Sequence, residues 1–76
     1  MSKLPKLTGA ELARIVVKLG FVPVRQHGSH VFYKHADGRT VTIPVHSGEQ
    51  LDRGLLNKIT KHDLRLTREQ FLELLC

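Results

Sequence analysis

The residues of this chain best suited to chemistry are Gly28, Ser29 and His30, which are consecutive. An imidazole has an ordinary pKa of about 6.5, so a histidine can accept and donate a proton near neutral pH. Glycine lets the backbone approach a ligand closely, so the amides around Gly28 and Ser29 are candidates for binding a phosphate. The combination predicts a site for a phosphate-bearing substrate, with His30 as the proton-transfer group.

Charge and length limit what such a site can act on. The 76 residues include 12 Lys and Arg against 7 Asp and Glu, a net charge of +5 at pH 7. This balance favours nucleic acid, an anionic membrane surface or an acidic protein as partner. A chain of this length forms one domain, residues 1–76, with no room for a deep pocket. We therefore expect an open binding face that takes RNA.

The cysteine content and the N-terminal residues bear on the compartment. Cys76 is the only cysteine, so no intramolecular disulfide can form. Residues 1–6 lack the apolar run of a signal peptide, and no segment has the character of a membrane span. We expect a cytoplasmic protein without membrane association.

Capping residues mark the starts of three predicted helices. Each helix begins at a Thr or Asp cap, two of them within a capping box, and continues as a stripe of apolar residues at helical spacing. The predicted ranges are 9–19 after Thr8 and Glu11, 53–62 after Asp52, and the segment from Thr67 and Gln70 to the chain end.

Between the first two helices the pattern changes to that of extended strands. Residues 21–25 form a predicted edge strand, because Pro23 lacks a backbone N–H. Residues 29–34 and 39–43 alternate and are rich in β-branched and aromatic residues. Turns are predicted at 26–28 and 35–38. Helices on one face of a three-stranded antiparallel sheet make an α+β domain, here in the order α-β-β-β-α with an additional C-terminal helix.

The turn around Asp37 and Gly38 decides where His30 points. A two-residue loop would place His30 on the same face as Val41 and Ile43. A three-residue loop over 36–38 shifts the pairing by one and leaves the face with His30 open. We favour the three-residue loop because it buries fewer polar groups, with Val31 and Tyr33 then inside.

Over residues 7–72 the chain resembles the HicA toxins, also called YcfA-like, of bacterial type II toxin–antitoxin systems. Six segments in this order carry the resemblance: Leu7–Leu12, Leu19–Phe21, Arg25–His30, Asp37–Arg39, Val41–His46 and Gly54–Ile59. The resemblance implies a fold similar to the double-stranded RNA-binding domain. It also implies an mRNA interferase that blocks translation by cleaving mRNA, with His30 as the catalytic residue, and a HicB-type antitoxin as partner.

Other side chains are candidates for roles around His30. Arg25, Lys34 and Arg39 could hold phosphates, and His46 is the candidate for a second proton-transfer group, although a solvated loop histidine is the simpler interpretation. His27, His35 and His62 look like turn or surface residues. We do not expect strand and turn geometry to bring His27 and His30 together as metal ligands, so we expect neither a metal nor a cofactor.

Two other functions compete with the ribonuclease. A non-catalytic RNA-binding module of the same fold would bind RNA without cleaving it. A protein-interaction domain would use its basic face for an acidic antitoxin and have little affinity for RNA. Only the enzyme predicts that His30→Ala abolishes RNA cleavage while most of the RNA binding is retained.

Overall fold

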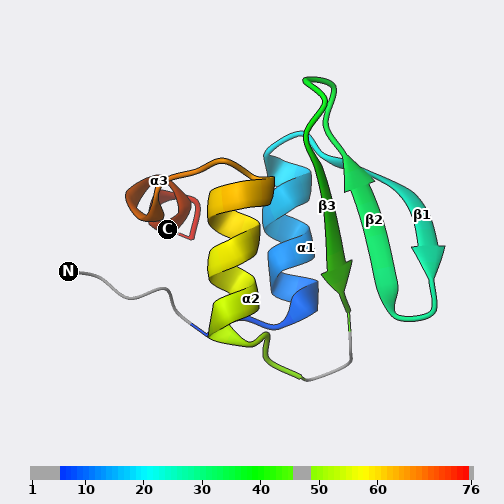
Figure 1. The fold of residues 1–76 in the computed structure, drawn as a ribbon, viewed down its shortest axis with the longest axis horizontal. Coiled ribbons are helices and arrows are strands. Elements are labelled where there is room, and N and C mark those ends of the chain that lie inside the picture. The colour runs from blue at the N-terminus through cyan, green and yellow to red at the C-terminus, as the bar shows by residue number, and fades with distance from the viewer. Residues whose placement is uncertain (1–5, 46–48, 76) are drawn as a thin grey trace.

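A helix, a three-stranded sheet and a C-terminal helical region follow one another along the chain (Figure 1). The computed structural model describes residues 6–45 and 49–75. The elements are α1 (Gly9–Lys18), β1 (Val22–His27), β2 (His30–Lys34), β3 (Thr40–Pro44), α2 (Arg53–Lys58), the π-helical segment η1 (Ile59–Asp63) and α3 (Arg68–Glu73). The predicted α+β class and the α-β-β-β-α order of a double-stranded RNA-binding-domain-like fold are confirmed.

The predicted capping residues do begin the helices. The Glu11 amide donates to the Thr8 hydroxyl over 3.2 Å, and the Thr8 amide donates back to the Glu11 carboxylate over 2.9 Å. The same capping box starts α3, with Thr67 and Gln70. Asp52 caps α2 by accepting from two backbone amides. These contacts satisfy amides that would have no partner in the first helical turn.

The helix after Asp52 differs from the prediction in its second half. The α-helical part ends at Lys58, and the chain continues as one π-helical turn in which the Leu64 amide donates to the Ile59 carbonyl. The buried Thr60 hydroxyl donates to the Leu56 carbonyl over 2.8 Å. The last helix ends at Glu73 rather than continuing to the chain end. Apolar periodicity does not distinguish hydrogen bonds to residue i−4 from bonds to residue i−5.

The three strands form an antiparallel sheet in the order β1-β2-β3. In the pairing of β2 with β3, Val31 lies opposite Ile43 and Tyr33 opposite Val41. These apolar side chains face α1, whereas residues 30, 32, 34, 40 and 42 form the other surface, which we call the open face. The three-residue loop is confirmed, because the His35 amide donates to the Arg39 carbonyl and Gly38 has φ of +100°.

The first hairpin turn is shorter than predicted. β1 continues to His27, so the turn consists of Gly28 and Ser29 alone. Gly28 has φ of +62° and Ser29 is not in the left-handed region, as in the two-residue turns that match strand twist. A bulge between Pro23 and Arg25 shifts the pairing within β1. His27 is therefore a strand residue, although the sequence predicted it to lie in a turn.

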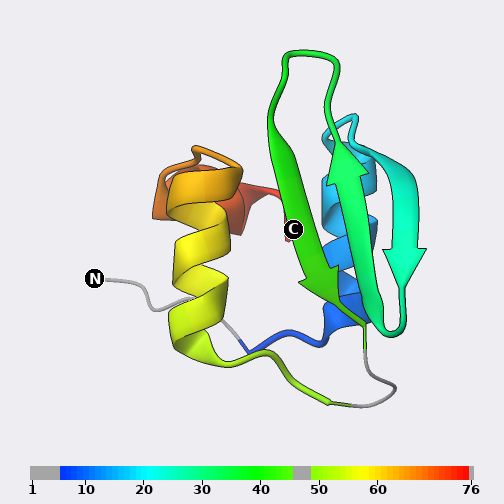
Figure 2. The same ribbon diagram turned by 45° about the vertical axis from the view of Figure 1, so that its right-hand side comes forward.

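One face of the sheet is covered and the other is not. α1 packs behind β2 and β3, while α2 and α3 lie beside α1 on the side away from β1 (Figures 1 and 2). The core consists of buried apolar residues from all three helices, η1 and the strands, including Leu12, Val16, Phe21, Ile43, Leu56 and Phe71. No helix in the described part of the chain is long and apolar enough to cross a membrane.

A polar cluster fixes the β2–β3 loop to the rest of the domain. His35 was predicted to be a turn or surface residue, but its Nε2 donates to the Leu19 carbonyl over 3.0 Å and its ring packs edge-on against Phe21. Asp37 accepts from the Arg39 amide and from Arg39 Nε, at 3.0 and 2.7 Å. Arg39 in turn donates to the Leu64 carbonyl over 2.7 Å. The loop is therefore tied to the ends of α1 and η1.

The first turn of α1 touches the end of β3. A Cβ atom at Gly9 would overlap the carbonyl oxygen of Pro44, so the two backbones approach too closely for any side chain. Pro44 is the residue opposite His30 in the sheet. The contact thus fixes the end of the sheet that carries His30 relative to the helix behind it.

We expect Gly9→Ala to destabilise the protein, although alanine favours an isolated helix by about 1 kcal/mol. The methyl group must displace α1 or β3, at a cost of about 1–3 kcal/mol. Urea unfolding followed by circular dichroism measures the change. Gly54→Ala is the comparison variant, since its added Cβ meets a side-chain atom, the Asp52 carboxylate oxygen at 3.0 Å, and no backbone of another element. Equal stability changes for the two variants would contradict the Gly9–Pro44 contact.

Asp37 predicts how stability depends on pH. The hydrogen bond from the Arg39 amide has the largest effect and lowers the pKa of the Asp37 carboxyl. The Arg39 guanidinium lowers the same pKa further. A lowered pKa in the folded state stabilises the protein above the ordinary value of about 3.9, and this stabilisation is lost as the pH falls through the folded value.

Asp37→Asn should therefore unfold more easily at pH 7 and lose less stability than the parent between pH 5 and pH 2. The pKa of Glu11 is lowered as well, by its bonds to Thr8, so part of the decline should remain. Thermal unfolding across this pH range tests the expectation. Glu73→Gln, the same charge change on an exposed position of α3, is the control. If the stability of Asp37→Asn and of the parent declined in parallel with pH, the stabilising role of the Asp37 carboxylate would be refuted.

Candidate active site

His30 is the first residue of β2 and lies exposed on the open face. Its position follows from the β2–β3 register, which turns Val31 and Tyr33 toward α1 and leaves His30 on the other side. Within residues 6–45 and 49–75, the His30 ring makes no hydrogen bond or ion pair. Its two ring nitrogens are thus available to a ligand that approaches the sheet from solvent.

His27 lies directly opposite His30 on the neighbouring strand. Residues paired in this way project to the same face, with Cβ atoms about 4.5–5.5 Å apart. His27 is exposed and, among the described residues, its ring also makes no hydrogen bond or ion pair. The sequence did not predict this pairing, because β1 extends two residues further than the predicted strand 21–25.

The turn between the two histidines is held in place from both sides. The Gln26 side-chain amide donates to the Gly28 carbonyl over 3.0 Å, and the Val45 amide donates to the Ser29 carbonyl over 2.7 Å. A Cβ built on Gly28 would meet no atom within 4 Å, so the space beside this backbone is open. A phosphate oxygen can therefore reach the backbone at Gly28.

A cation and an aromatic ring lie one step along the sheet from the histidine pair. Arg25 is paired with Phe32, and its guanidinium carbon lies 5.4 Å from the centre of the Phe32 ring. An arginine held over an aromatic ring keeps its charge on the surface and its orientation limited. The sequence of β1, β2 and β3 contains no acidic residue, so the strands offer an anion only neutral and positive groups.

The remaining predicted site residues are placed differently. Lys34 is exposed on the open face, at the end of β2 far from His30. Arg39 lies with its side chain only 18% exposed, bonded to Asp37 and Leu64 and over the Phe21 ring, so it is not beside His30. His46 lies outside the residues that the structure describes.

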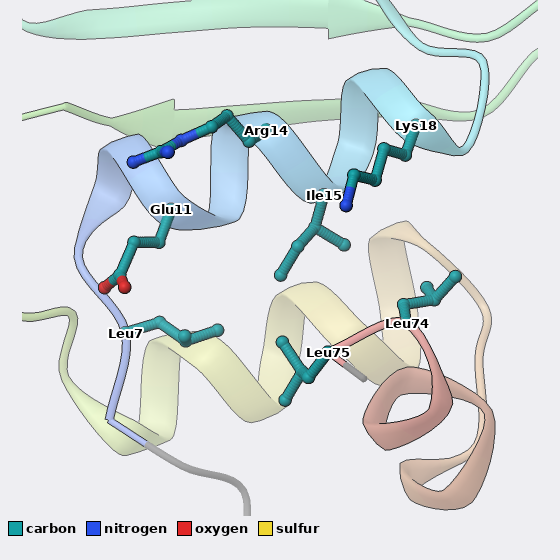
Figure 3. Close-up of a pocket in the computed structure, with 7 residues that line it drawn as sticks. All are labelled: Leu7, Glu11, Arg14, Ile15, Lys18, Leu74 and Leu75. Atoms are coloured by element: carbon teal, nitrogen blue, oxygen red, sulfur yellow. The ribbon is translucent and has the colours of Figure 1, made fainter.

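A second concavity lies on the opposite side of α1 from the sheet (Figure 3). Leu7, Ile15, Leu74 and Leu75 form its apolar walls, with charged residues from α1 at its rim. The one carboxylate there, that of Glu11, is engaged by Thr8 in the capping box. None of the described residues that line this groove is a histidine or a cysteine, whereas the open face carries two exposed histidines.

The described residues of the open face offer groups for acid–base chemistry on an anion. Structural and catalytic zinc sites take three or four protein ligands. Across the described residues, no group of three or more His, Cys, Asp or Glu side chains could hold a metal ion. The open face instead combines two imidazoles, an accessible turn and an ordered arginine.

Comparison with known proteins agrees with this arrangement of elements. A search against curated proteins finds no match. Residues 9–65 match the family model described as the HicA toxin of bacterial toxin–antitoxin systems, a segment that begins with α1 and includes the whole sheet, α2 and η1. The chain therefore belongs to the HicA toxin family, whose members are the toxins of toxin–antitoxin systems.

Proposed function

We propose that this toxin is an endoribonuclease that cleaves mRNA and so inhibits translation. The observation that carries the proposal is an exposed histidine, His30, on an open sheet face without acidic residues, in a member of the HicA toxin family. RNA supplies both a polyanion for such a face and a nucleophile, its 2′-hydroxyl.

The proposed reaction is an attack of the 2′-oxygen on the adjacent phosphorus. His30 acts as general acid or base in the proton transfers, a role that typically contributes about 10²–10⁴-fold to the rate. Negative charge develops on the phosphoryl oxygens during the attack. In this scheme Arg25, paired with Phe32 on the open face, and the backbone amides around the open turn at Gly28 and Ser29 stabilise this charge.

The open shape of the site suits unpaired RNA. A single strand can lie across the three strands, with its phosphates near Arg25 and the histidines and a base against Phe32. Lys34 extends the positive charge along the same face. No step of this scheme uses a metal or a cofactor.

The partner implied by the family is an antitoxin, which we propose to be of the HicB type. An active site on an open face can be inhibited by a protein that covers it. Such a protein would exclude RNA without changing the fold of the toxin. An acidic surface on the antitoxin would complement the net charge of +5.

We expect the purified chain to cleave end-labelled mRNA in the presence of EDTA and His30→Ala to lose at least about 10²-fold of that activity. Because His30 is exposed and its ring makes no hydrogen bond or ion pair to any described residue, His30→Ala should fold normally and retain most of its RNA affinity. His62→Ala, a change of the exposed histidine on η1, is the matched control. Equal cleavage by all three proteins would refute the assignment, whereas binding without cleavage would identify a non-catalytic RNA-binding module.

Arg25→Gln should weaken RNA binding for all sequences alike. Removal of one phosphate contact reduces the slope of log K against log salt by about 0.7–0.9. Filter binding or fluorescence anisotropy at several salt concentrations measures both effects. Arg14→Gln is the control, since Arg14 is exposed on α1, behind the sheet. An identical salt slope for Arg25→Gln and the parent would exclude Arg25 from the RNA-binding face.

A further inference from the structure

We propose that His27 is a second catalytic residue, which shares the two proton transfers of RNA cleavage with His30. This inference rests on the proposed ribonuclease activity and assigns a residue to it. It starts from the pairing of the two histidines across the β1–β2 hairpin.

Cross-strand pairing places both imidazoles on one face at a short, fixed separation. The pairing is regular from Arg25 to His27 and from His30 to Phe32, and only the two residues of the turn separate the histidines. The hydrogen bonds to the Gly28 and Ser29 carbonyls hold this turn. Two rings on Cβ atoms about 4.5–5.5 Å apart can contact different oxygens of one phosphate.

Neither ring has a structural task in the described part of the protein. His35 provides the contrast, because both of its ring nitrogens are engaged: Nε2 by the Leu19 carbonyl and Nδ1 by the Asp37 amide. Both nitrogens of this ring are therefore occupied inside the domain. The rings of His27 and His30 meet solvent, with no hydrogen bond or ion pair to any described residue.

The charged groups that face the pair favour a phosphate between them. Arg25 is the next open-face residue on β1, and Lys34 is the far residue of the same face on β2. From β3 the open face carries Thr40, Thr42 and Pro44, none of which titrates. A bound phosphate would also stabilise the positive charge of whichever histidine is protonated.

The reaction balances with two imidazoles and no further reagent. One neutral histidine takes the proton of the 2′-hydroxyl while the 2′-oxygen forms a bond to phosphorus. The bond from phosphorus to the 5′-oxygen breaks, and the other, protonated histidine donates its proton to that oxygen. The products are a 2′,3′-cyclic phosphate and a 5′-hydroxyl end, with the proton moved from one ring to the other.

The first test compares His27→Gln, His30→Gln and the control His62→Gln in cleavage of one RNA between pH 4.5 and 9. Each of the first two variants should lose at least about 10²-fold of the rate, and a single group should then control the pH profile in place of a bell. RNA affinity at fixed pH and salt should change by less than about threefold, because a general acid or base acts on the transition state. Full activity of His27→Gln beside an inactive His30→Gln would overturn the role of His27 and leave the proposed function intact. Inactivity of the parent protein would instead overturn the proposed function.

The second test uses RNA with a sulfur in place of the 5′-bridging oxygen at the cleaved position. Sulfur leaves without protonation, so this substrate needs the base but not the acid. If the histidines divide the work, the substitution should restore the rate of one of the two single variants to within about tenfold of the parent and not that of the other. Restoration of both variants, or of neither, would overturn the division of proton transfers between His27 and His30.

Discussion

The register between β2 and β3 is the constraint on which the rest of this structure depends. With three residues in the loop, Val31, Tyr33, Val41 and Ile43 all face α1 and complete the core. A shift by one residue would keep Val41 and Ile43 inside but turn Val31 and Tyr33 to solvent and press His30 and Phe32 against the helix. Burial of four apolar side chains therefore determines that the histidine face is open. The site is exposed because the core is formed correctly.

The basic residues divide into structural and accessible groups. The Arg39 guanidinium joins the β2–β3 loop to the end of η1 and to Phe21, so it is largely engaged in contacts within the domain. Arg25 and Lys34 retain exposed charge on the open face. The net charge alone could not separate these two groups. What distinguishes them is the face of the sheet from which each side chain leaves the backbone.

Close backbone contacts fix the end of the sheet that carries His30. These contacts leave the open face of the sheet accessible. Gly9 lets α1 touch the Pro44 carbonyl, and the Val45 amide holds the Ser29 carbonyl. Both contacts lie behind or beside the turn at Gly28. A small domain with little core can in this way keep two exposed histidines in fixed relative positions. Rigid placement of proton-transfer groups is a large part of what an active site supplies.

The sequence by itself determined the helix starts, the α+β class and the inside and outside of β2, with His30 on the outside. These depend on local signals: a threonine with a Glu or Gln three residues later, alternation along a strand, and a glycine that permits a left-handed turn. Only the tertiary structure decided that β1 continues to His27, that His35 and Arg39 act inside the domain, and that one helix turns π-helical. For β1, His35 and Arg39 the deciding partner lies elsewhere in the chain: His30, the Leu19 carbonyl and the Leu64 carbonyl, respectively. Local patterns describe single elements, whereas contacts between elements far apart in the chain form only when the core assembles.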